Sequence, residues 1–276
     1  MTNHWKKITG AERAYTDHCI AQLKSCPWVH DLINKTEKTR DNNGDFPNSS
    51  MPLLFEIRFA YALYKVGLST QNGYKCGTKN SEIKDSDVDF FVTKTDGTKW
   101  FIELTSLDES DEVKTNTSVE GAWSLYTGKG VDDPYKIYRR AQSNIFSKVA
   151  KNEDNVMPTK FLPPEKGEHN IIIIDMRGLM VATPDNYDYS IVINGENDIP
   201  IEGVPFLRGI FNPNNPDSRA KYLQERIHGI GFINESDYAA GEIQSKIELF
   251  CNPKFFTNNS VLRESFPLEK IRHDSC

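Results

Sequence analysis

The feature that most constrains the fold is a run of four consecutive isoleucines, Ile171 to Ile174, set between Asn170 and Asp175. Successive side chains of a strand point to opposite faces of its sheet, so a strand of this composition must be buried on both faces. Other elements then have to cover both sides of the sheet. Together with the order of the helices and strands around it, the run predicts an α/β protein rather than a sandwich or a helical bundle.

Apolar periodicity and turn residues place further elements around this strand. Helices are predicted at about 10–35, broken near Pro27, at 53–66, from 133 to about 151, and at 218–225. Strands are predicted at 87–94, 99–106, 170–175, weakly at 190–193, and at 227–233 and 246–251. The polar stretches 34–50 and 108–132 and most of 178–215 are predicted as connectors or loops. The expected organisation is an N-terminal helical extension and connector (1–49), an α/β core (50–252) and a C-terminal tail (253–276).

Composition narrows the class of protein. No apolar run reaches the roughly 20 residues that a bilayer requires, and the N-terminus lacks the apolar core of a secretory signal, so we expect a cytoplasmic protein without a membrane partner. The five cysteines are scattered, which favours free thiols over a zinc site. The net charge of −6 counts against a protein that coats nucleic acid nonspecifically. It does not exclude a nuclease, whose metal site is itself acidic.

Acidic residues alternate with apolar ones in the two strands predicted at 87–106. Asp89 lies between Val88 and Phe90, and Glu103 shares one strand face with Thr105. The type of turn decides whether the two acids meet. A two-residue turn places Asp89 opposite the neighbouring leucine, whereas a three-residue turn at 95–97 places it opposite Glu103. Both turns fit the local sequence.

If the second turn forms, the two carboxylates stand close together. At a separation of ~4 Å their repulsion is roughly 4 kcal/mol at an effective dielectric constant near 20. A shared proton, a basic partner or a divalent cation must offset it, and hard oxygen ligands suit Mg²⁺ or Mn²⁺. Replacing either acid by its amide should relieve the repulsion. The alternative is that both acids lie on a solvated face of the sheet.

Glu56 lies in the helix predicted at 53–66, on the same face as Phe59, Ala60 and Leu63. A carboxylate on an apolar face is expected to be buried, where it needs a partner or takes up a proton. Glu56 therefore belongs either to a functional site or to a structural ion pair.

The order of these residues resembles the PD-(D/E)XK nuclease superfamily, which has the restriction-endonuclease-like fold. That core contains a helix with a Glu, a hairpin with an Asp followed by Glu-x-Lys, a helix and another strand. The matching residues are Glu56, Asp89 and Glu103, and the resemblance covers about 50–176. It implies a mixed central sheet flanked by helices, and a cation, Mg²⁺ or Mn²⁺, held by Asp89, Glu103 and the main-chain carbonyl of Leu104.

The sequence departs from the family pattern at the lysine, because Thr105 stands in that position. Family members without this lysine often supply a basic or amide group from the following helix. Gln142 and Lys148 are the candidates here, about 120° apart around the helix. Gln142 is the preferred site residue, and the alternative for Lys148 is an ordinary surface lysine.

Three functions are compatible with these residues. The first is a metal-dependent endonuclease that hydrolyses phosphodiesters, preferably in DNA, with Glu56, Asp89, Glu103, Thr105, Gln142 and Lys148 around the reacting group. The second is a catalytically degenerate relative that binds nucleic acid or a protein without cleaving, which Thr105 and the acidic charge favour. The third is an interaction protein in which the acids are structural. The sequence is also compatible with a homodimer.

Overall fold

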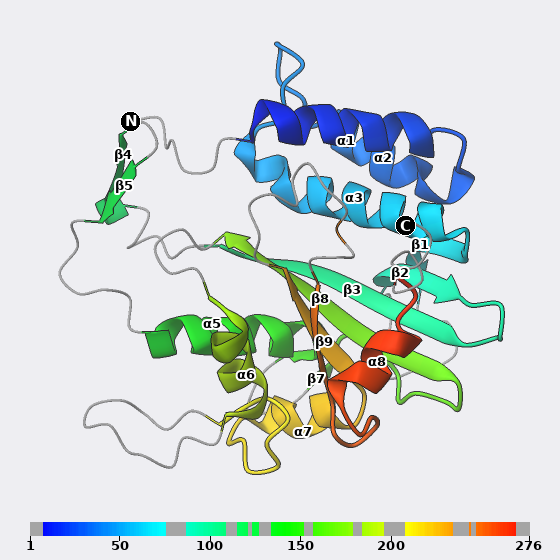
Figure 1. Cartoon of the computed structure of the whole chain (residues 1–276), viewed down its shortest axis with the longest axis vertical. Coiled ribbons are helices and arrows are strands. Elements are labelled where there is room, and N and C mark those ends of the chain that lie inside the picture. The colour runs from blue at the N-terminus through cyan, green and yellow to red at the C-terminus, as the bar shows by residue number, and fades with distance from the viewer. Residues whose placement is uncertain are drawn as a thin grey trace.

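The structure is a computed structural model, and it describes residues 8–75, 87–108, 115–120, 123–126, 134–151, 157–178, 184–195, 208–233, 243 and 247–268. A six-stranded mixed sheet lies between two layers of helices (Figure 1). The prediction of an α/β protein with a mixed sheet flanked by helices is confirmed.

The sheet has the strand order β1-β2-β3-β8-β9-β10. Its strands are β1 (Ser69–Lys75), β2 (Asp87–Thr93), β3 (Lys99–Asp108), β8 (Glu168–Gly178), β9 (Gly229–Ile233) and β10 (Glu248–Cys251). The three central strands β3, β8 and β9 are parallel, and the outer pairs are antiparallel. Two small sheets pair β4 (Thr117–Glu120) with β5 (Trp123–Tyr126) and β6 (Ala150–Lys151) with β7 (Met157–Pro158).

The isoleucine run forms the middle of β8. All four side chains are fully buried. Ile171 and Ile173 belong to the hydrophobic core on one face of the sheet, and Ile172 and Ile174 belong to the core on the other face. The prediction of a strand buried on both faces is confirmed.

Helices cover the two faces separately. On one face lie α1 (Gly10–Leu23), α2 (His30–Glu37) and α3 (Met51–Val66), and on the other lie α5 (Pro134–Val149), α6 (Asn186–Asn194) and α7 (Ser218–Gln224) (Figure 1). Two short 3-10 helices, η1 (Pro27–Val29) and η2 (Asn48–Ser50), precede α2 and α3, and α8 (Asn259–Ser265) packs against β10. No described helix is long and apolar enough to cross a membrane.

Local sequence explains several helix ends. The Thr9 hydroxyl accepts a hydrogen bond from the Glu12 N–H and caps α1. The predicted break near Pro27 is confirmed, since α1 ends at Leu23 and η1 begins at Pro27. α3 ends at Val66, the predicted last residue, and Gly67 caps it with a φ of 71° that only glycine adopts at no steric cost.

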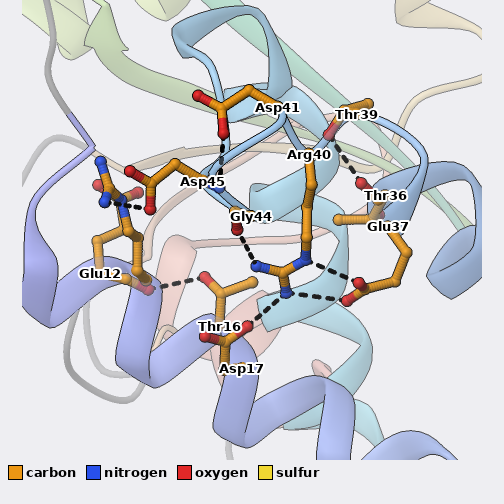
Figure 2. Close-up of polar contacts among 11 residues, drawn as sticks. Glu12, Thr16, Asp17, Thr36, Glu37, Thr39, Arg40, Asp41, Gly44 and Asp45 are labelled. Carbon is orange, nitrogen blue, oxygen red and sulfur yellow. Dashed lines mark hydrogen bonds and ion pairs between the residues drawn. The ribbon is translucent and has the colours of Figure 1, made fainter.

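The segment between α2 and α3 is tied down by Arg40 (Figure 2). Its guanidinium donates hydrogen bonds to Glu37, Asp17 and the Gly44 carbonyl, and it lies 3.9 Å from the ring centroid of the buried Phe46. The predicted connector begins four residues later than expected, because α2 continues to Glu37. These contacts fasten the connector to the N-terminal helices, whose apolar side chains share one core with α3.

Other predicted elements were missed or wrong. β1 was not predicted, because it is an edge strand in which exposed polar residues outnumber apolar ones. The weak strand predicted at 190–193 is wrong, since these residues lie in α6. A capping box between Asp185 and Asp188 starts that helix and outweighs the strand preference of its β-branched residues. The loop predicted at 108–132 contains β4 and β5, and its remaining residues beyond 116 lie outside the described part of the chain.

Candidate active site

The hairpin of β2 and β3 has the register that the three-residue turn predicts. Phe90 pairs with Ile102, and Gly97 has a φ of 83°. Continuing this register by one pair places Asp89 opposite Glu103. The prediction of the turn and of its register is confirmed.

The two strands stop pairing where the acids lie. The ladder ends at Phe90 and Ile102. Beyond it, a side-chain oxygen of Asp89 (Oδ2) accepts a hydrogen bond of 2.6 Å from the Leu104 N–H. On the other side of β2, the Asn72 side chain donates to the Asp89 main-chain carbonyl at 2.9 Å. These bonds fix the Asp89 carboxylate beside the peptide group of Leu104.

Glu103 lies at the centre of the site and forms ion pairs with two lysines. Its side chain is 1% exposed. The Lys160 ammonium lies 2.6 Å from Oε1 and 2.7 Å from Oε2, and the Lys148 ammonium lies 3.1 Å from Oε1. Burial lowers the pKa of the Lys160 ammonium, but the charge and hydrogen bonds of Glu103 outweigh it and raise that pKa overall. Glu103 is therefore a buried carboxylate that two lysine ammonium groups bind.

Glu56 and Asp89 are compensated less completely, because lysine charges lower their pKa values by less than burial and the neighbouring acids raise them. Burial, together with the charges of Asp89 and Glu103, raises the pKa of Glu56 to about 8. Burial and the charge of Glu103 raise the pKa of Asp89 to about 7, although the Leu104 N–H lowers it in part. Glu56 makes no hydrogen bond or ion pair with any described residue. Glu56 is partly buried, and the effect of the Asp89 charge on its pKa indicates that the two carboxyls lie near each other, so the three acids form a local surplus of negative charge.

One face of α5 lies along β3 at this site. The Thr105 hydroxyl donates a hydrogen bond of 2.9 Å to the side-chain oxygen of Asn144. One turn further along the helix, Lys148 reaches Glu103. Thr105 is thus near the carboxylates, but its hydroxyl is engaged by a neutral amide.

The choice between Gln142 and Lys148 was wrong. The Gln142 side chain is buried and donates to the main-chain carbonyls of Val192 and Arg208, at 3.0 and 2.8 Å. It therefore fastens α5 to α6 and to the segment beyond it. The two residues do lie on different faces of the helix, as their spacing predicts, and the lysine is the one that faces the acids.

Lys160 was not predicted at all. It lies in the segment between β7 and β8, outside any element with a periodic pattern, and only the path of that segment carries it to Glu103. Its neighbour Phe161 is buried and has a φ of 39°, a conformation that non-glycine residues rarely adopt. Backbone strain of this kind persists only where the surroundings over-determine it. The sequence carried no signal for Lys160 beyond its charge.

The donors available to a cation can now be compared with the prediction. Within the described ranges, no three His, Cys, Asp or Glu side chains are arranged to hold a metal ion. The expected set is smaller, with two carboxylates and the Leu104 carbonyl, and its oxygen donors suit Mg²⁺ or Mn²⁺ chemically. Two raised carboxyl pKa values also mark a place where added positive charge is favourable. A cation can bind these donors on one condition: the Lys160 ammonium must give up its contact with one carboxylate oxygen of Glu103.

Asp175 is not at the end of its strand, where the sequence placed it. It is buried inside β8, which continues to Gly178.

Comparison with known proteins adds no relationship to this geometry: no family model, curated protein or solved structure matches the chain.

Proposed function

We propose that the protein is a metal-dependent nuclease that hydrolyses phosphodiester bonds, with DNA as the favoured substrate. The observation that carries this proposal is the gathering of three carboxylates from three elements, α3, β2 and β3, against two lysines. A purely structural ion pair needs one acid and one base. Here Glu56 and Asp89 exceed what the lysines bind, and the surplus lies where the hairpin strands separate.

The arrangement of elements supports the same proposal. Along the chain, α3, β1, β2, β3, α5 and β8 occur in this order, with the small strands β4 to β7 between β3 and β8. The four larger strands are neighbours in the sheet, and β3 and β8 are parallel. A helix, an acid-bearing hairpin, a helix and a further strand make up the core of the PD-(D/E)XK nucleases that the sequence resembles. We therefore propose a restriction-endonuclease-like core.

Each residue then has a role that follows from its position. Asp89, Glu103 and the Leu104 carbonyl would hold Mg²⁺ or Mn²⁺, which when bound supplies an activated water and positive charge for the scissile phosphate. Lys148 and Lys160 provide the positive charge that Thr105 cannot, because a hydroxyl carries none. Glu56, which remains without an ion-pair partner in the described structure, is the acid available to bind a second cation or a metal-bound water.

A second candidate function rests on Lys160. Its ammonium contacts both oxygens of Glu103, so it occupies the place that a cation would need. If this contact persists with substrate present, the chain would be a degenerate relative that binds nucleic acid without cleaving it. Lys160 would then offer a fixed positive charge beside the phosphate.

Plasmid and single-stranded DNA and RNA, incubated with Mg²⁺, Mn²⁺ or EDTA, distinguish the two functions. We expect metal-dependent cleavage by the wild type. Asp89→Asn should lose roughly 10²- to 10³-fold or more of it, because several kcal/mol of metal-derived stabilisation corresponds to that factor. Glu264→Gln, which changes an exposed acid of α8, is the matched control and should cleave normally.

Two results would contradict the proposed nuclease function. Undiminished metal-dependent cleavage by Asp89→Asn would show that the activity does not depend on this site. No cleavage by the wild type, combined with binding of the same substrates, would support the degenerate binding protein. Lys160→Met separates the roles of that lysine, since it should gain metal affinity if the ammonium competes with the cation.

A further inference from the structure

A cavity opens on the same face of the sheet as Glu103. Its volume is about 130 Å³, smaller than the roughly 300 to 1,000 Å³ of sites that enclose a whole ligand. Its floor includes Tyr74, Phe91 and Phe101, and the segment that carries Lys160 contributes Phe161 and Leu162. Phe101 is two residues before Glu103 on β3, or roughly 7 Å along the strand. The cavity therefore adjoins the candidate active site.

The floor of the cavity is a cluster of three aromatic rings, each only partly buried. Tyr74 stacks on Phe91 with 4.3 Å between ring centroids, and Phe91 and Phe101 are 5.0 Å apart. The rings come from three adjacent strands, so the sheet holds them rigidly in place. Partly exposed aromatic side chains on a sheet are the surfaces on which proteins stack unpaired bases.

The charged residues around the cavity favour a neutral ligand. Lys75 and Lys99 are balanced by Glu165 and Glu168, and Lys99 lies 3.1 Å from Glu168 in an ion pair. A phosphate would meet both acids, whereas a base can donate its N–H groups to them. Positive charge suited to a phosphate lies instead at Lys160, which precedes Phe161 in the chain and contacts Glu103.

We propose that Tyr74, Phe91 and Phe101 form a stacking platform for an unpaired nucleobase, next to the phosphate that the lysines bind. This inference rests on the proposed function, because the platform adjoins the active site that function assigns. It specifies the substrate as single-stranded nucleic acid, or a strand with a displaced base. In a continuous duplex both faces of each base are covered by its neighbours, so no face is free to stack on the protein.

The test compares two labelled single strands of equal length and charge, oligothymidine and a fully abasic oligonucleotide, by fluorescence anisotropy in EDTA. Without metal, binding is measured independently of cleavage. The wild type should bind the thymidine strand roughly 5- to 150-fold more tightly, the factor expected from one stacked base. In Tyr74→Leu/Phe91→Leu this ratio should fall to about 1, with the affinity for the abasic strand unchanged.

Tyr187→Leu is the matched control, since Tyr187 is a 73% exposed aromatic residue of α6, away from the cavity. It should keep the wild-type ratio. Circular dichroism checks that each variant folds, and Tyr74→Leu alone, on the edge strand β1, replaces the double variant if that protein does not fold. The comparison of the two strands with the wild type needs no variant at all.

A wild-type ratio near 1, an unchanged ratio in the variants, or no binding of either strand would overturn the platform. These results are independent of the cleavage assay. Metal-dependent cleavage with a ratio near 1 would leave the nuclease standing without the platform. A high ratio that the variants abolish, without cleavage by the wild type, would establish the platform on a binding protein.

Discussion

Glu56 and Arg58 lie two positions apart in α3, but their side chains enter opposite electrostatic environments. Arg58 forms an ion pair of 3.1 Å with Glu12 of α1, and the two side chains are 0% and 5% exposed. Glu56 faces Asp89 and Glu103 instead, and its pKa is raised to about 8 by burial and by their charges. The first environment matches one base with one acid. The second contains more acid than its lysines bind.

Buried charges with a structural role and buried charges at a ligand site differ in how fully the protein compensates them. A buried charge is tolerated when a partner of opposite sign and hydrogen bonds replace its lost hydration. The pair of α1 and α3 meets this requirement within the protein. Nearby lysine charges offset the raised pKa values of the Glu56 and Asp89 carboxyls only in part, so we propose that this part of the molecule is the one arranged for a ligand.

The largest expected effect breaks the matched pair. Arg58→Met leaves the buried Glu12 without its arginine and should lower the free energy of unfolding by about 3–5 kcal/mol. Urea unfolding followed by circular dichroism measures it. The control is Arg13→Met, because Arg13 and its partner Asp45 are 37% and 41% exposed and such pairs contribute about 1 kcal/mol or less. Equal losses in the two variants would remove the distinction between the pairs.

A smaller effect distinguishes the acids within the unmatched cluster. Glu103→Gln takes away the partner of Lys148 and Lys160, so we expect a loss of about 1–3 kcal/mol in the free energy of unfolding. Asp89→Asn removes one like charge and should leave the metal-free protein at pH 8 as stable or more stable. The sequence alone predicted relief of repulsion for both amides, and the two lysines reverse that expectation for Glu103. Stabilisation of both variants in urea unfolding would show that the lysines do not bind Glu103 in solution.

A third effect is a contribution to the pH dependence of stability that the unmatched cluster should show and the matched pair should not. The folded pKa values of Glu56 and Asp89, about 8 and about 7, lie above the ordinary values near 4. For these two groups the folded state holds protons that the unfolded state has lost, so their contribution to stability should decrease as pH rises from about 4 to about 8. Burial lowers the pKa of His228 to about 3, which contributes a slope of opposite sign below about pH 6.5, so the comparison with a variant isolates the acids. Asp89→Asn should reduce this slope in thermal unfolding with EDTA, whereas an identical slope in the variant would contradict the raised pKa of Asp89.

Metal binding should also distinguish the unmatched acids from the matched ion pair. Mg²⁺ at ten times its dissociation constant should stabilise the protein by roughly 1.4 kcal/mol at pH 8, and by less at pH 6, because the cation needs ionised carboxylates. Arg58→Met, whose substitution lies outside the cluster, should keep this response if it folds. A response to Mg²⁺ that is equal at both pH values would argue against binding by these acids.

Much of the framework could be predicted because it depends on local rules. The isoleucine run required burial on both faces, and Gly97 permitted the turn that brings Asp89 and Glu103 together. Strand alternation and helical periodicity have fixed repeats, so neighbouring residues are enough to assign faces. β1 and α6 escaped the same rules, the first because it is a polar edge strand and the second because a capping box opposed its β-branched residues.

The partners of the acids could not be predicted in this way. The spacing of Gln142 and Lys148 showed that they lie on different faces of one helix, but only the packing of α5 against β3 decided that Lys148 faces Glu103. Lys160 is 57 residues from Glu103 and reaches it from an irregular segment. The sequence by itself determined which acids share the hairpin, because backbone geometry links them over a few residues. The tertiary structure alone decided which charges neutralise them, because such contacts depend on how distant elements pack.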